Sequence, residues 1–168
     1  AKVAMGCSEM IQMVVYPDLA RMWAGKVKGK FRKTVVSIQG LLGVIMGSII
    51  IVALLVGKPL ISLAFGSDFV PAYTILVTHL FAVFLIMHSA PARSALLAMN
   101  RPQYVLMTAT CSTVLFLGIA LYAIPIYGAV GASFAHIGFG ALTAILLDIS
   151  MWRNFNRQVG TPDAVEAS

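Results

Sequence analysis

Four long apolar stretches dominate the chain and predict four membrane-spanning helices. A bilayer core of roughly 30 Å takes about 20 apolar residues in a helix. The stretches that meet this length run from about Thr34 to Gly57, Pro71 to Met99, Tyr104 to Ile124 and Gly131 to Met151. We therefore expect an all-α, polytopic membrane helix bundle, with the four spans filling residues 34–152.

The first twenty residues give a weaker signal. Residues 1–20 contain Lys2, Glu9 and Gln12 and reach a Tyr-Pro pair at Tyr16 and Pro17, where we expect the helix to stop. This pattern is typical of the end of a truncated span, and an interfacial amphipathic helix remains the alternative. Because the sequence begins with Ala rather than Met, we expect a fragment of a longer protein.

The composition is typical of a membrane protein, and the positions of the charged residues predict which segments face the cytoplasm. Hydrophobic residues make up 60% and charged residues only 11%, where soluble domains have about 25% charged residues. Six of the twelve Lys and Arg residues lie in the predicted loop 21–33, which has no acid. Positive loops face the cytoplasm, so this loop, the link near Arg101 and the tail 153–168 are predicted to be cytoplasmic.

This basic loop explains much of the net charge of +6 without nucleic acid. Juxtamembrane cations attract anionic head groups. We therefore expect anionic membrane lipids, and no nucleic acid, at Arg21, Lys26, Lys28, Lys30, Arg32 and Lys33.

The outer link 58–70 is too apolar for an ordinary loop. We predict a short helix along the membrane surface from about Pro59 to Phe65, which Gly66 would end. Pro71 would then begin the next span, since proline suits the first turn of a helix.

Small residues predict close helix packing, with a hinge for a conformational change as the alternative. Gly43 and Gly47 have the GxxxG spacing that lets two helices approach, and the last span has a similar set at Gly131, Ser133, Gly138 and Gly140. The two cysteines, Cys7 and Cys111, lie in apolar stretches and are expected to be small core residues rather than a disulfide.

Polar residues at membrane depth are the candidates for function. Arg93 either extends its guanidinium to the inner surface or faces an aqueous cavity and attracts an anion. His88 either bonds between helices or lines that cavity. His79, nine residues earlier, falls on the opposite helix face, so the two histidines are not expected to share a metal ion.

Three further polar groups have weaker assignments. Asp148 is expected to pair with cations such as Arg153, and Gln39 lies near the inner end of its span. Glu9 is a candidate for a buried coupling carboxylate, of the kind that binds a driving ion.

Enzyme motifs are absent from the sequence. It has no HExxH, CxxC, P-loop or GxSxG pattern. Ser133 and His136 lie three positions apart on one helix and are expected to pack rather than react. We therefore expect no enzyme activity, no catalytic residue, no metal ion and no cofactor.

Four segments together resemble a known family. Residues 14–33, 58–73, 96–104 and 124–136 read VVYPDLARMWAGKVKGKFRK, KPLISLAFGSDFVPAY, LLAMNRPQY and IPIYGAVGASFAH. In order and spacing they resemble the C-terminal part of bacterial polysaccharide (O-antigen type) flippases. These belong to the multidrug/oligosaccharidyl-lipid/polysaccharide exporter superfamily.

The resemblance implies a fold and an activity. The fold would be the late helices of a twelve-helix transporter with two bundles in the bacterial inner (plasma) membrane. The activity would be the flipping of an undecaprenyl-pyrophosphate-linked oligosaccharide by alternating access, with the remaining helices of the full-length transporter as partners. Arg93 and His88 would then be tentative substrate-binding residues. A cation-coupled multidrug exporter of the same fold, and a small non-transporting membrane assembly subunit, are the alternatives.

Overall fold

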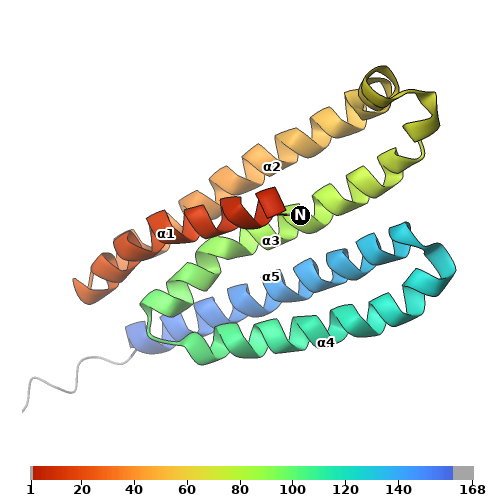
Figure 1. Cartoon of the computed structure of the whole chain (residues 1–168). Helices are drawn as coiled ribbons and strands as arrows, with labels where there is room; N and C mark the ends of the chain where they lie inside the picture. Colours follow the sequence, from red (N-terminus) through yellow and green to blue (C-terminus); the bar gives the residue numbers. More distant parts are fainter. Residues whose placement is uncertain (1, 161–168) are drawn as a thin grey trace, which may run out of the picture.

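The chain folds as a bundle of helices. A computed structural model describes residues 2–160, with the side chains of residues 13–158. Its helices are α1 (Lys2–Ala24), α2 (Lys28–Phe65), α3 (Ala72–Ala98), α4 (Pro102–Tyr127) and α5 (Ala129–Gly160), with a 3-10 turn at Ser67–Phe69 (Figure 1). Among the described residues there is no strand, and α2 to α5 are each long and apolar enough to cross a membrane. The predicted all-α membrane fold is confirmed.

The helix ends gather at two opposite ends of the bundle. The α1–α2 turn, the α3–α4 turn and the C-terminal end of α5 lie together at the left of Figure 1. Lys28 Nζ donates a hydrogen bond to the backbone oxygen of Gln158, 2.8 Å away, and so joins α2 to α5 there. We call this the basic end, because Lys28, Arg32, Arg101, Arg153 and Arg157 all lie at or near these helix termini. The opposite end, with the α2–α3 and α4–α5 turns, we call the apolar end.

Both turns at the basic end are short and have the same form. Lys26 and Asn100 adopt left-handed φ values of 55° and 56°. The next N–H group of each turn donates back into the preceding helix, from Val27 to Met22 O at 3.1 Å and from Arg101 to Leu96 O at 2.9 Å. This pattern caps the last carbonyls of a helix.

The predicted long basic loop 21–33 is therefore wrong. Only residues 25–27 lie outside the helices. Lys and Arg are good helix formers, and the segment contains no proline to stop them, so its charges extend both helices beyond their apolar parts.

Three other predicted boundaries are wrong for a related reason. The separate surface helix from Pro59 to Phe65 does not form, because α2 continues through Pro59 before ending at Gly66. Helix α1 likewise continues through Pro17, and α5 extends to Gly160 where a tail was expected from residue 153. Neighbouring packing in a membrane bundle tolerates an internal proline. The predicted stop at Gly66 and the start at Pro71 are confirmed.

Helix α5 joins α3 to α4. Its contacts with these two helices are the most extensive of any helix pair in the bundle, whereas α3 and α4 touch only slightly and α3 also packs on α1 and α2. A Cβ at Gly140 of α5 would lie 3.1 Å from Ala82 O and 3.1 Å from Leu85 Cβ of α3. The predicted close packing of small residues in this span is confirmed at this crossing.

The predicted close approach at Gly43 and Gly47 is wrong within the described chain. A Cβ at either position would meet no atom within 4 Å. The buried side chains of α2 nearby, Met46 and Ile50, are large, and they hold the backbone of α2 away from its neighbours.

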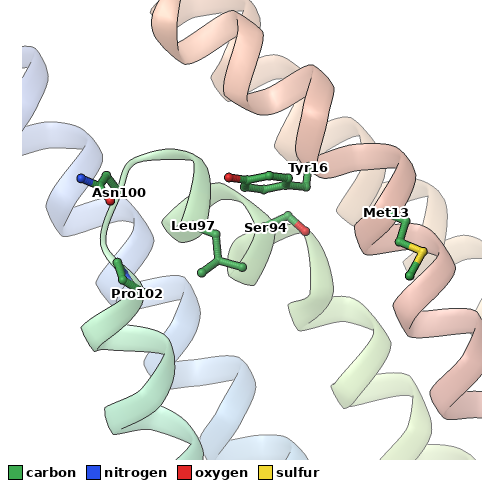
Figure 2. A pocket seen from close by; sticks show the side chains of 6 residues that line it. All are labelled: Met13, Tyr16, Ser94, Leu97, Asn100 and Pro102. Carbon is green, nitrogen blue, oxygen red and sulfur yellow. The ribbon is translucent and has the colours of Figure 1, made fainter.

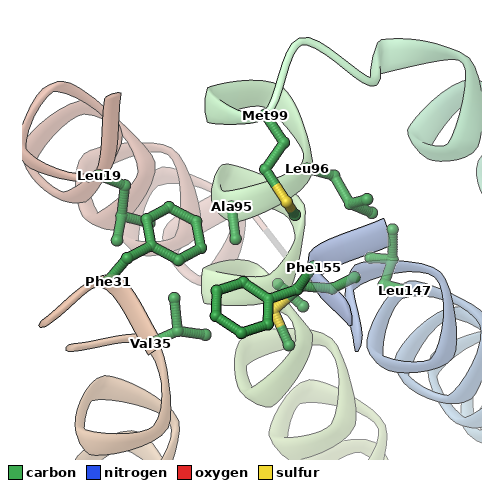
Figure 3. Close-up of a cluster of buried hydrophobic side chains, with 10 residues drawn as sticks. Leu19, Phe31, Val35, Ala95, Leu96, Met99, Leu147 and Phe155 are labelled. Atoms are coloured by element: carbon green, nitrogen blue, oxygen red, sulfur yellow. The ribbon is translucent and has the colours of Figure 1, made fainter. Parts of the chain in front are cut away.

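The main hydrophobic cluster lies at the basic end and joins α1, α2, α3 and α5 (Figure 3). Phe31 of α2 stacks on Phe155 of α5, with centroids 6.1 Å apart and planes 6° apart, and Trp23 of α1 lies 5.0 Å from Phe31. The Arg32 guanidinium lies 5.3 Å from the Trp152 ring centroid. Cation–π contacts of this kind are favourable, so aromatic packing holds α1, α2 and α5 together at this end.

Candidate functional site

A polar pair joins α2 to α5 inside the bundle. Gln39 Nε2 donates a hydrogen bond to Asp148 Oδ1 at 2.9 Å, and the Gln39 side chain is buried. The prediction that Asp148 pairs with Arg153 is wrong. Five positions turn a helix by about 140°, so Arg153 lies on a different face, where it is exposed.

His88 of α3 brings a third helix to this pair. It lies in the neighbourhood of Asp148, and its ring stacks on Phe84 with centroids 6.1 Å apart. His88 Nδ1 is buried and has no hydrogen-bond partner among the described residues. An amide, a carboxylate and an imidazole from three helices therefore gather in one region, which we call the polar cluster (Gln39, His88 and Asp148).

Arg93 lies on α3 between the polar cluster and the basic end. It is five residues from the end of α3, or about 8 Å along the helix. The side chain is half-buried, and its Nε atom is buried without a hydrogen-bond partner in the described part of the chain. Ser94 Oγ, on the next residue, is in the same state. The choice between an arginine that reaches the surface and one that faces a cavity stays a prediction.

A cavity of about 430 Å³ opens next to this part of α3. Its lining comes from α1, α3 and the α3–α4 turn, and consists of Met13, Tyr16, Ser94, Leu97, Asn100 and Pro102 (Figure 2). The Tyr16 ring extends from α1 toward Ser94 and Leu97. Neither Arg93 nor His88 lines this cavity, although Ser94, the residue next to Arg93 in sequence, does.

A second cavity, of about 370 Å³, lies between α4 and α5. Its polar lining includes Arg153, Asn154 and Arg157 of α5 and Thr108 of α4. This groove was not predicted from the sequence. The available signal was the spacing of Arg153 and Arg157 by four positions, which puts them on one helix face.

The other two histidines form a separate contact near the apolar end. The rings of His79 and His136 meet edge to face with centroids 5.4 Å apart, and Phe116 lies 5.0 Å from His136. His79 and His88 are therefore in different environments, as their nine-residue spacing predicts. No group of three metal-binding side chains occurs in the described part of the chain.

Ser133 and His136 each interact with the backbone of their own helix. Ser133 Oγ donates to Ala129 O at 3.4 Å, and His136 Nδ1 lies 3.3 Å from Ala132 O. They are therefore not arranged as a nucleophile and its base, which would need a hydrogen bond between the two side chains.

Three further residues singled out in the sequence, Glu9, Cys7 and Cys111, lie on α1 and α4. Glu9 belongs to α1, but its side chain and that of Cys7 lie outside the described ones, so the coupling role of Glu9 stays a prediction. Cys111 is exposed on α4 as a free thiol. The expectation that it is a core residue is wrong, because the buried face of α4 is formed by smaller or polar neighbours, Thr108, Ser112 and Ala120.

Comparison of the chain with protein families, with curated proteins and with solved structures gives no match.

Proposed function

We propose that this chain is part of a transporter that flips an undecaprenyl-pyrophosphate-linked oligosaccharide across the bacterial inner membrane by alternating access. One observation carries the proposal. Arg93 keeps a buried nitrogen without a hydrogen-bond partner among the described residues, and so does His88, which lies about 140° away around the same helix of the membrane bundle. An unpaired polar group in a membrane interior is costly, so such groups favour a ligand that satisfies them.

The chemistry of these groups suits a pyrophosphate. A guanidinium offers five donors in a planar fork that matches phosphate oxygens, and a charge-assisted hydrogen bond is stronger than a neutral one. The positive-inside rule orients the basic end toward the cytoplasm. In that orientation Arg93 lies near the leaflet from which the substrate would be taken, and the C-terminus is cytoplasmic. The remaining helices of the full-length transporter would complete the substrate path.

Replacing Arg93 tests this proposal. We expect Arg93→Ala, in the complete gene product, to lower surface polysaccharide about tenfold, because one charge-assisted contact to the substrate is lost. The measurement is surface polysaccharide per molecule of transporter in the membrane. Arg93→Gln, which keeps a long polar side chain, guards against a folding defect, and Arg101→Gln at the nearby turn is the control. Undiminished surface polysaccharide in Arg93→Ala would refute a role of Arg93 in substrate binding.

A cation-coupled exporter is the second candidate, and the polar cluster favours it. Asp148 is a carboxylate inside a span, held by Gln39 and near His88. Intramembrane acids and histidines of this kind occur in proton relays.

Asp148→Asn distinguishes the two functions, because asparagine can still bond to Gln39 but cannot carry a negative charge. For a flippase of an anionic substrate we expect the variant to leave the accumulation of a cationic dye in cells unchanged. Dye accumulation is read by fluorescence, with Arg93→Ala as the comparison. A rise in accumulated dye for Asp148→Asn alone would support the exporter instead.

A further inference from the structure

The groove between α4 and α5 is built from one face of each helix. The residues that α5 contributes recur at three- and four-residue spacing, and they are Leu146, Ile149, Ser150, Arg153, Asn154 and Arg157. Those of α4 have the same spacing, and they are Tyr104, Met107, Thr108 and Cys111. This spacing keeps side chains on a single helix face, so the groove runs along the two helices rather than across them.

The character of the groove changes along its length. Toward the basic end it presents Arg153 and Arg157, both exposed, and the half-buried ring of Tyr104. One to three helical turns farther from the basic end, the lining is apolar and consists of Ile149, Leu146 and Met107. From Ile149 to Arg157 the helix rises about 12 Å, which is comparable with the depth of the head-group and upper acyl region of one leaflet.

The charged groups that line the groove within the described part of the chain have one sign. Two guanidinium groups line it there, and no described carboxylate does. The nearby acid on α5, Asp148, is directed to Gln39 of α2 and away from this face. Asn154 is buried, and its Nδ2 donates to Ser150 O at 2.8 Å, which holds the polar wall beside the arginines in place.

We propose that this groove binds an anionic phospholipid of the leaflet at the basic end. The phosphate lies between Arg153 and Arg157, and an acyl chain follows Ile149, Leu146 and Met107 toward the bundle centre. The two arginines supply the charge complementarity, and the apolar continuation explains why the occupant is a lipid rather than a soluble anion. The site is separate from the basic α1–α2 segment and from Arg93, so this proposal does not depend on the transported substrate.

The exposed thiol of Cys111 gives a local probe of the groove. The full chain, with Cys7→Ser so that Cys111 alone reacts, is labelled with bimane and placed in phosphatidylcholine vesicles that contain phosphatidylglycerol. In one preparation the phosphatidylglycerol has brominated acyl chains, and in the other an equal fraction of the phosphatidylcholine has them. Bromine quenches bimane only at short range, so the ratio of the two quenching values measures the preference of the groove for the anionic lipid.

We expect brominated phosphatidylglycerol to quench more strongly, and Arg153→Gln/Arg157→Gln to lower that preference about tenfold, since each basic group near an anionic surface contributes to binding. Lys30→Gln/Lys33→Gln removes the same charge from two exposed positions of α2 and should leave the ratio unchanged. Retention of phosphatidylglycerol by the unlabelled protein in native mass spectrometry checks that the label does not block the groove. Unchanged tryptophan fluorescence from Trp23 and Trp152 shows that the variants are folded.

Two results would overturn the proposal. One is an equal preference for phosphatidylglycerol in the arginine variant and the parent protein, in both measurements. The other is loss of the preference on adding inorganic phosphate at constant ionic strength, which would identify a site for a free anion.

Discussion

Gly131→Ala is expected to destabilise the bundle by about 3 kcal/mol, the upper range for forcing an added group into a packed site. Gly131 lies in the first turn of α5, opposite the end of α4. A Cβ there would overlap the backbone oxygen of Ala123 and lie 2.5 Å from its carbonyl carbon and 3.0 Å from Ile124 N. These are backbone atoms, which cannot rotate away as a side chain can, so α4 and α5 must separate. The free energy of unfolding in mixed micelles, followed by circular dichroism, measures the effect.

Gly118→Ala is the matched control. Gly118 lies in the middle of α4. A Cβ there would meet no atom within 4 Å. Alanine is favoured over glycine inside a helix by about 0.5–1 kcal/mol, so this variant should be as stable as the parent or slightly more stable. If both variants behaved alike, the close contact between Gly131 and Ala123 would be contradicted.

Phe31→Ala is expected to lower the free energy of unfolding by about 3–5 kcal/mol, as removal of a buried phenyl ring does elsewhere. The Phe31 side chain is 1% exposed and packs between Trp23 and Phe155. Its loss removes one member of the aromatic cluster that holds α1, α2 and α5 together at the basic end. Both tryptophans of the chain, Trp23 and Trp152, pack against this cluster, so intrinsic fluorescence during unfolding reports on it directly.

Leu41→Ala is the control that separates the loss of packing inside the cluster from the loss of an apolar side chain as such. Leu41 lies on the same helix and is 59% exposed, so in a membrane its side chain contacts lipid, and truncation should change stability by less than about 0.5 kcal/mol. A comparable loss in Leu41→Ala and Phe31→Ala would mean that the cluster at the basic end adds no stability of its own.

Much of the fold could be predicted from the sequence because lipid requires long apolar helices. The four spans, the turn at Gly66 and the helix start after Pro71 all follow from length, hydropathy and proline or glycine placement. The errors share a cause. Pro17, Pro59 and the cations of 21–33 are local signals for an interruption, but helix continues through both prolines and is broken within 21–33 only at residues 25–27. In a bundle, neighbouring packing outweighs the local preference of single residues.

The candidate site was predictable only in part. His88 and Arg93 could be singled out because charged or polar residues are rare at membrane depth. The partner of Asp148 could not, because Gln39 is 109 positions away in sequence, and only the arrangement of α2 beside α5 brings them together. The face of α2 that carries Gly43 and Gly47 was misjudged for the same reason, since spacing along one helix does not reveal whether another helix lies there.

The contacts of α5 set the order in which the helices can pack during synthesis. Helices α3 and α4 are neighbours in sequence but barely touch, and each finds its main partner in α5. Single spans are stable in lipid before they associate. During synthesis α3 can pack on α1 and α2 as soon as it is inserted, whereas α4 must wait until α5 leaves the ribosome. A ribosome stalled before Ala129 would therefore leave α4 inserted without its main partner, which is the form that membrane quality-control proteases would meet.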